Sequence, residues 1–204
     1  MACLALASCG GGDSGDNAIA YDCSVFPAAS ASPFILPWNV GTTHRANPHA
    51  ARETSPQKYA LDLLMPIGTE VLAILDGTVV RVVENFTDDD HTRGHENYVY
   101  VQHADDTVAR YIHLTNNGAL VAVGDAVAQG QVIGLSGDTG NSTDPHLHLD
   151  VTEGCCAVPP DYNQLPEGQT RPLNFRNAAG VTAAITPDLA CGLLLGEFYT
   201  ALPY

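Results

Sequence analysis

Short apolar segments of five to seven residues follow one another closely between residues 59 and 152, with turn-forming residues between them. No stretch of useful length before residue 176 shows the 3.6-residue apolar period of an amphipathic helix. The sequence therefore predicts an all-β, mainly antiparallel domain. The expected strands are residues 59–64, 70–75, 78–83, 98–102, 107–112, 121–127, 129–134 and 146–152.

Two dipeptides indicate hairpins between these strands. Asp76-Gly77 separates residues 70–75 from residues 78–83, and Asp-Gly is a strong hairpin signal. Asp105-Asp106 separates the next two strands in the same way. The remaining segments are expected to be loops, namely the polar residues 41–57, the acidic residues 84–96 and the Pro-rich residues 157–172.

His146 and His148 are separated by one residue, Leu147, in the segment Thr143–Asp150. Because side chains alternate along a strand, both imidazoles share one face, while Leu147 and Leu149 share the other. The two rings can therefore meet at one point. Taken alone, the pattern fits two polar side chains on a solvated strand face equally well.

Two more residues stand in similar strand settings. Asp62 is the only charge in the apolar stretch Tyr59–Pro66, and a buried carboxylate is costly unless it is paired or bound to metal. The alternative for Asp62 is a turn-capping role before Gly68. His113 ends a strand, where a histidine alone indicates nothing more than a satisfied polar group. Together with the two histidines above, these residues make a nitrogen and oxygen set suited to Zn²⁺.

Residues 59–80, 97–114 and 119–151 resemble the lysostaphin/LytM-type zinc metallopeptidases. The matching motifs occur in the family's order with several fixed spacings. They are Y-A-x-D-x-x-M-P-x-G-T-x-V-x-A, A-x-Y-x-H-L, G-D-x-V-x-x-G-Q-x-I-G-x-S-G and T-G-N-S-T-D-P-H-L-H. The resemblance implies a barrel-like hybrid metallopeptidase domain with long loops. It also implies a zinc endopeptidase of the cell envelope that hydrolyses the peptide cross-links of peptidoglycan.

The resemblance assigns a role to each matching residue. Asp62 and His148 correspond to zinc ligands. His113 and His146 correspond to the two histidines that hold and activate the zinc-bound water. Zinc lowers the pKa of bound water to about 7, and a neighbouring imidazole can take or return a proton.

This chain lacks a histidine at the position where the family usually has its third protein ligand. That ligand is a histidine that usually precedes the aspartate by four residues, where this chain has Lys58. We expect His49 to replace it, with His44 behind it. Glu53 is the second candidate, because residues 54–59 resemble the stretch that follows the histidine in longer-spaced members, and carboxylate is a legitimate zinc ligand. Loss of the ligand is the third interpretation.

Other polar residues near these motifs receive weaker assignments. His91 and His95 lie in a polar loop and are expected to be solvated, and His103 starts a hairpin turn with little to place it at the site. Asn97 and Arg110 are conceivable substrate contacts that no pattern singles out.

The first residues resemble a bacterial lipobox, in which Leu6-Ala7-Ser8 precedes a lipidated Cys9. Only eight residues precede Cys9 and none is basic, which suggests a truncated or misassigned start. The chain is expected to lie at the periplasmic face, lipid-anchored to the outer membrane. The expected parts are a signal remnant at 1–9, a flexible tether at 10–32, the metallopeptidase domain at 33–176 and a C-terminal extension at 177–204.

Four cysteines, Cys23, Cys155, Cys156 and Cys191, remain for disulfides in an oxidising compartment. A bond within the vicinal pair is sterically poor. We therefore expect one of the pair to reach Cys23 and the other Cys191, which would tie the C-terminal extension to the domain. Zinc binding by these cysteines is the rival interpretation, but C-x-x-C spacing is missing.

Charge and composition limit the possible partners. The net charge is −15, with 23 acidic residues against 8 Lys and Arg, which argues against nucleic acid as a partner. No apolar run reaches the length of a membrane span. The chain is expected to be a monomer.

Two other functions compete with hydrolysis. One is a non-catalytic module that binds or regulates other wall hydrolases, since some relatives of this fold have lost metal residues. The other is a carrier-type barrel, because residues 124–134 resemble the lipoyl/biotinyl-carrier hammerhead. A carrier needs a modifiable lysine on a hairpin, and the only lysine is Lys58. Gly-Gly and D-Ala–diaminopimelate bonds both remain as the cleaved cross-link, the second favoured by the lipobox.

Overall fold

The structure is a computed structural model that describes residues 23–48, 57–153, 170–180, 192–194 and 196–204. The regular secondary structure of these residues is almost entirely β-strand, as the sequence predicts. The elements are η1 (Cys23–Val25), η2 (Ala29–Ala31), β1 (Thr43–Pro48), β2 (Leu61–Leu64), β3 (Glu70–Leu72), β4 (Gly77–Val83), β5 (Tyr98–Gln102), β6 (Val108–Ile112), β7 (Leu114–Ala119), β8 (Ala126–Val127), β9 (Val132–Ser136), β10 (His146–Thr152), β11 (Ala178–Gly180) and β12 (Phe198–Ala201).

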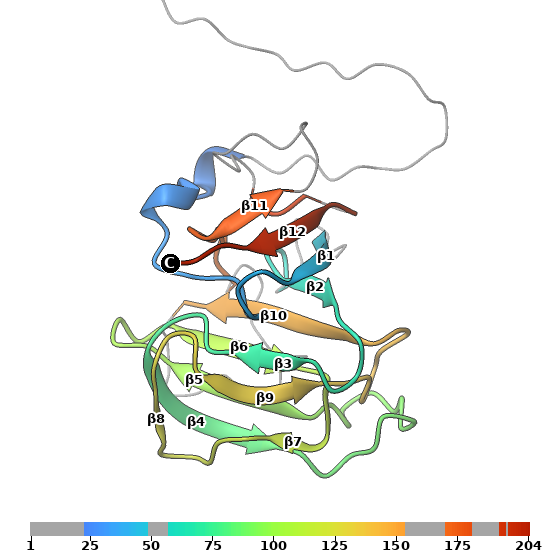
Figure 1. Cartoon of the computed structure of the whole chain (residues 1–204). Coiled ribbons are helices and arrows are strands. Elements are labelled where there is room, and N and C mark those ends of the chain that lie inside the picture. The colour runs from blue at the N-terminus through green and yellow to red at the C-terminus, as the bar shows by residue number, and fades with distance from the viewer. Residues whose placement is uncertain (1–22, 49–56, 154–169, 181–191, 195) are drawn as a thin grey trace, which may run out of the picture.

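The strands form two sheets (Figure 1). The larger has nine strands in the order β11-β12-β1-β2-β10-β6-β5-β4-β8, and the smaller has three in the order β3-β9-β7. Neighbouring strands pair antiparallel throughout both sheets. β10 joins β2 to β6 near the middle of the larger sheet, so residues far apart in the sequence become neighbours there.

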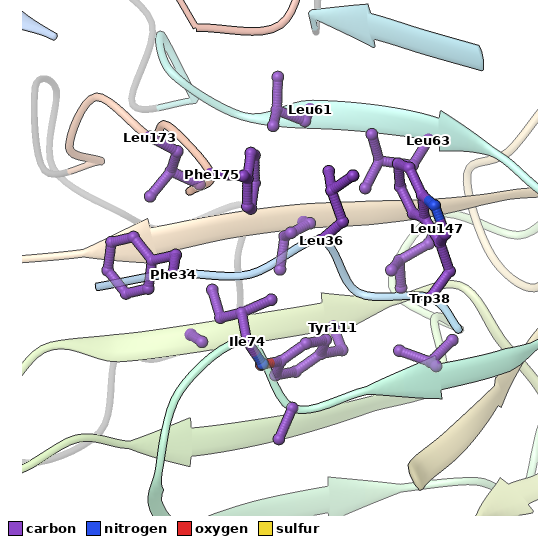
Figure 2. Close-up of a cluster of buried hydrophobic side chains, with 14 of the residues drawn as sticks. Phe34, Leu36, Trp38, Leu61, Leu63, Ile74, Tyr111, Leu147, Leu173 and Phe175 are labelled. Carbon is purple, nitrogen blue, oxygen red and sulfur yellow. The ribbon is translucent and has the colours of Figure 1, made fainter. Parts of the chain in front are cut away.

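The main hydrophobic core lies between the sheets and includes side chains of residues 33–38, the segment before β1. Leu36 and Trp38 of this segment are buried, and Figure 2 shows Trp38 beside Leu63 and Leu147. The hydroxyl of Tyr111 accepts the backbone N–H of Ile74 at 2.8 Å, which links the larger sheet to the chain after β3. Burial of this much apolar surface is the main favourable term in folding.

Alternation along β10 separates the core from the polar face of the larger sheet. Leu147, Leu149 and Val151 are fully buried in the core. Their neighbours His148 and Asp150 therefore point to the opposite face. This parity determines where the candidate site lies.

The expected hairpin at Asp76-Gly77 is wrong. β3 pairs with β9 in the smaller sheet, whereas β4 pairs with β5 and β8 in the larger one. A Cβ on Gly77 would lie 2.4 Å from the carbonyl oxygen of Gln102, so glycine permits a close strand approach here. The Asp76 carboxylate accepts the backbone N–H of Gln129 at 2.6 Å. The hairpin at Asp105-Asp106 is confirmed by the β5–β6 pairing.

Three other segments differ from expectation. Residues 43–48 of the expected loop 41–57 form β1, which pairs with β12 and β2 although it has little apolar periodicity. β7 has no counterpart among the expected strands. Of residues 121–127, only β8 is a strand. In each case pairing with distant strands decides the conformation, so the apolar pattern of the segment itself does not predict it.

The two ends of the described chain pack against the domain. Ala29 and Ser32, within the expected tether, are buried, and the Ser32 hydroxyl donates to the carbonyl of Asn174. Asn177 accepts the N–H of Leu36 at 2.7 Å, and β11 and β12 join the larger sheet beside β1. The described part of the C-terminal extension thus belongs to the same sheet as the domain.

Several expectations fall outside the described residues. They concern the lipobox and Cys9, the outer part of the tether, and the cysteines at positions 155, 156 and 191. The disulfide pairing and the lipid anchor therefore stay predictions. Among the described residues, no helix is long and apolar enough to span a membrane.

Candidate functional site

The register of the larger sheet brings the expected site residues together. Asp62 in β2 pairs with His148 in β10, and paired residues of antiparallel strands point to the same face. Asp62 Oδ1 lies 2.9 Å from His148 Nδ1 and 3.7 Å from His146 Nε2. A carboxylate and two imidazoles therefore converge from two adjacent strands.

His113 joins this group from the end of β6. Its backbone has a φ of 66°, which turns the chain out of the strand. Its ring centroid lies 4.6 Å from that of His146 and 6.1 Å from that of His148. Nδ1 lies 2.6 Å from the carbonyl oxygen of Thr139, and since a carbonyl only accepts, Nδ1 carries the proton. Burial, and then the charges of the two histidines, lowers the pKa of His113 to about 3, so its ring is neutral at neutral pH.

His146 is held by the loop before β10. Its Nδ1 lies 2.7 Å from the carbonyl oxygen of Asp144 and 3.2 Å from the Ser142 hydroxyl. The carbonyl again requires a proton on Nδ1. Nε2 is therefore the nitrogen that faces Asp62 and bears the lone pair of the neutral ring.

His148 lies between two carboxylates. Nδ1 faces Asp62, and Nε2 lies 3.2 Å from Asp150 Oδ2. Burial alone would lower the pKa of His148, but the hydrogen bonds and charges of Asp150 and Asp62 outweigh it and raise the pKa to about 9. Burial would raise the pKa of Asp150, yet the Arg110 guanidinium lowers it to about 2.

The structure does not describe the two leading candidates for a third ligand, because His49 and Glu53 lie outside its described ranges. Among the residues that it does describe, no group of three or more His, Cys, Asp or Glu side chains is arranged to hold a metal ion.

The structure argues against His44 as the third metal ligand, because its side chain lies on the face of β1 opposite to Asp62. Asn47 pairs with Asp62, so the odd-numbered residues of β1 share the face of Asp62. The even-numbered Ala46 is fully buried in the core. The His44 ring lies on that side too, 5.2 Å from the Trp38 ring centroid. A metal held by Asp62 lies on the opposite face of the strand.

Asn97 and Arg110 are both completely buried, which argues against a direct substrate contact. The Asn97 amide accepts from and donates to the backbone of Phe86, and the Arg110 guanidinium pairs with Asp150. Thr139 and Asp150 are two further residues of the site that the sequence motifs did not indicate. Asp150 follows His148 by two residues on one strand, and that parity could have identified it, whereas no local signal marks Thr139.

The remaining histidines have other partners or surroundings. His91 is exposed, whereas His95 stacks on Phe86 with ring centroids 4.3 Å apart and lies 2.7 Å from Asp90. His95 is thus more than a solvated loop residue. His103 is buried, with Nδ1 2.8 Å from the Thr107 hydroxyl, so it does not line the site.

His103 predicts an acid-sensitive contribution to stability. Burial lowers its pKa to about 4, below the value of about 6.5 for an unfolded chain. The unfolded state therefore binds more protons between these values, and stability falls as the pH drops from 6.5 towards 4. From pH 7 to pH 5 we expect a loss of about 1 to 2 kcal/mol that His103→Gln removes. Urea unfolding of both proteins at the two pH values measures it, and equal losses would contradict it.

Comparison with known proteins places this geometry in context. The model of peptidase family M23 matches residues 56–160. An uncharacterized metalloprotease of Buchnera aphidicola subsp. Baizongia pistaciae is 35% identical over 122 residues, which are 58% of this chain and 30% of that protein. The peptidoglycan DD-endopeptidase ShyA of Vibrio cholerae is 44% identical over 93 residues, 44% of this chain and 19% of the relative.

Among solved structures, the catalytic domain of the antimicrobial peptidase lysostaphin from Staphylococcus simulans is 31% identical. The match covers 58% of this chain and 83% of that one, with a TM-score of 0.42. The matched region spans less than a third of the length of the two curated relatives.

Proposed function

The chain belongs to peptidase family M23, and from this we propose that it is a zinc-dependent endopeptidase of the cell envelope that hydrolyses peptide cross-links of peptidoglycan. The observation that carries the proposal is the 2.9 Å approach of Asp62 Oδ1 to His148 Nδ1, with the His113 and His146 rings beside them. A carboxylate and an imidazole are ordinary zinc ligands. The relatives of this chain include both a peptidoglycan DD-endopeptidase, ShyA, and a glycyl-glycine endopeptidase of Staphylococcus capitis, so both kinds of cross-link are candidate substrates.

The residues present fit a zinc ion. Two ligands of one zinc, at bond lengths of about 2.0 to 2.2 Å, lie about 3 to 3.5 Å apart, close to the separation of the Asp62 and His148 donor atoms. Asn47, on the same face of the neighbouring strand, has a buried Oδ1 that accepts no hydrogen bond. A buried oxygen without a donor is costly, and a cation beside it removes that cost.

The protein's own groups would handle the protons of the reaction. A bound zinc would supply a water of lowered pKa and polarise the scissile carbonyl. Neutral His113, anchored through Nδ1 to Thr139, would accept a hydrogen bond at Nε2 and orient the attacking water. His146, anchored through Nδ1 to Asp144, would take a proton at Nε2 and return it to the leaving amine.

For the third ligand we propose His49, with Glu53 as the alternative. β1 ends at Pro48, one residue after Asn47, whose position is directly opposite Asp62. The chain therefore passes beside Asp62 immediately before His49, which favours His49 over the more distant Glu53.

Metal analysis of the full chain tests this assignment. We expect about one zinc per chain in the wild type, loss of zinc in His49→Ala and retention in Glu53→Ala. His91→Ala, which changes an exposed histidine, is the matched control. The reverse pattern would assign Glu53. A wild-type chain that binds no zinc even after incubation with the metal would overturn the enzyme proposal.

A non-catalytic module is the second candidate, and Lys58 is the observation that favours it. This residue stands where the family usually has its first histidine ligand, and its Nζ lies 5.2 Å from the ring centroid of Tyr59. If wild-type protein lacks zinc and activity but sediments with purified peptidoglycan, this second function replaces the first.

We further propose that the chain works as a monomer at the periplasmic face, anchored to the outer membrane through Cys9. Its disulfides would link the vicinal pair, Cys155 and Cys156, to Cys23 and Cys191. The family membership and the peptidoglycan-directed relative support an envelope location, and the lipobox motif supports the anchor.

A further inference from the structure

A second row of polar residues lies directly behind the candidate metal site. Tyr100 in β5 pairs with Arg110 in β6, and Arg110 pairs with Asp150 in β10. Asp150 follows His148 by two residues, so both side chains occupy one face of the larger sheet. The row therefore runs beside the one that contains Asp62 and His148.

Arg110 and Asp150 form a completely buried, two-pronged ion pair. Arg110 Nε donates to Asp150 Oδ1 at 2.6 Å, and Nη2 donates to Oδ2. Neither side chain is exposed. The cost of desolvating two charges cancels much of their attraction, so such a pair is weak evidence of a stabilising role. Its position suggests a different role.

The same carboxylate holds the ring of His148. Asp150 Oδ2 lies 3.2 Å from His148 Nε2, while Nδ1 on the opposite side of the ring faces Asp62. An acceptor at Nε2 keeps the proton on that nitrogen and leaves the Nδ1 lone pair for a metal. Since the two prongs of Arg110 fix the carboxylate plane, they also fix the direction in which the imidazole points.

We propose that Asp150 is a positioning residue for the metal site, held in place by Arg110, and that it fixes the orientation and tautomer of His148. The proposal deepens the proposed function and rests on it only in treating Nδ1 as a metal donor. The spare donor of Arg110, Nη1, and the Tyr100 hydroxyl are buried without hydrogen-bond partners. Among the residues that the structure describes, Arg110 therefore donates its side-chain hydrogen bonds to Asp150.

Two double variants of the full chain isolate this role. Arg110→Met with Asp150→Leu removes the ion pair and the acceptor together. Arg110→Met with Asp150→Asn removes the charges but keeps an acceptor oxygen of the same shape for His148. Neither variant leaves a buried charge alone, so both are expected to fold. Arg171→Met with Asp105→Asn, which removes an ion pair at 3.6 Å on the exposed surface, is the control.

Zinc affinity, measured by competition with a chelator, is the first readout. We expect the leucine variant to bind zinc about 10- to 100-fold more weakly than wild type. The asparagine variant should recover most of that loss, and the surface control should match wild type. A leucine variant within twofold of wild type would overturn the proposal.

The second readout does not need the metal. In zinc-free protein, the hydrogen-bonded Nε2–H of His148, assigned separately from an Nδ1–H that faces Asp62, should give a slowly exchanging downfield proton resonance. The leucine variant should lack this Nε2–H resonance and the asparagine variant should retain it. If wild type binds no zinc, the proposed function fails, and this resonance alone decides whether Asp150 holds the ring. Its persistence in the leucine variant would refute the inference.

Discussion

His146→Ala is expected to lower the rate of cross-link hydrolysis by about 10²- to 10⁴-fold while the zinc content stays at the wild-type value. His148→Ala, one residue pair further along the same strand face, is expected to lose both zinc and activity. The two histidines share one face of β10 but have different surroundings. His146 is anchored by the Asp144 carbonyl and lies 3.7 Å from Asp62, whereas His148 lies at 2.9 Å with Asp150 behind it.

The measurement pairs metal analysis with hydrolysis of purified, cross-linked peptidoglycan. His91→Ala is the control, because His91 is an exposed histidine of the loop between β4 and β5. Loss of zinc in His146→Ala would make His146 a ligand and overturn the division of roles. Activity within tenfold of wild type in that variant would assign proton transfer to His113 instead.

Strand parity explains why the sequence could predict that Asp62, His146 and His148 lie close together. The alternation of β10 places His146 and His148 on one face whatever the partner strands are. Asp62 stands out because a single charge in an apolar strand needs a partner. The hairpin of β5 and β6 was predictable for a different reason, which is that both strands and their turn are adjacent in the chain.

Features that depend on distant partners were not predictable. β1 is polar and becomes a strand through pairing with β2 and β12, the second of which lies more than 150 residues away in the sequence. Asp76-Gly77 has the residues of a hairpin turn, but it connects strands of different sheets. Thr139 orients His113 through its backbone carbonyl, and a backbone contact leaves no mark on the residue type.

The buried ion pair leads to the second large effect, which is on stability. Asp150→Leu alone is expected to lower the free energy of unfolding of the zinc-free protein by about 3 to 5 kcal/mol, because it leaves the Arg110 guanidinium buried and unpaired. Arg110→Met alone should cost less, since Asp150 then keeps the hydrogen bond from His148 Nε2. The double variant should lie closer to wild type than Asp150→Leu does, because no uncompensated charge remains.

Urea unfolding of the four proteins at one pH gives a double-mutant cycle for this pair. The expected signature is strong non-additivity, with the second substitution restoring stability lost in the first. Simple addition of the two single effects would show that Arg110 and Asp150 do not depend on each other in the folded protein. In that case the carboxylate behind His148 would owe its orientation to packing alone, and only the zinc affinities of the leucine and asparagine variants would bear on its role.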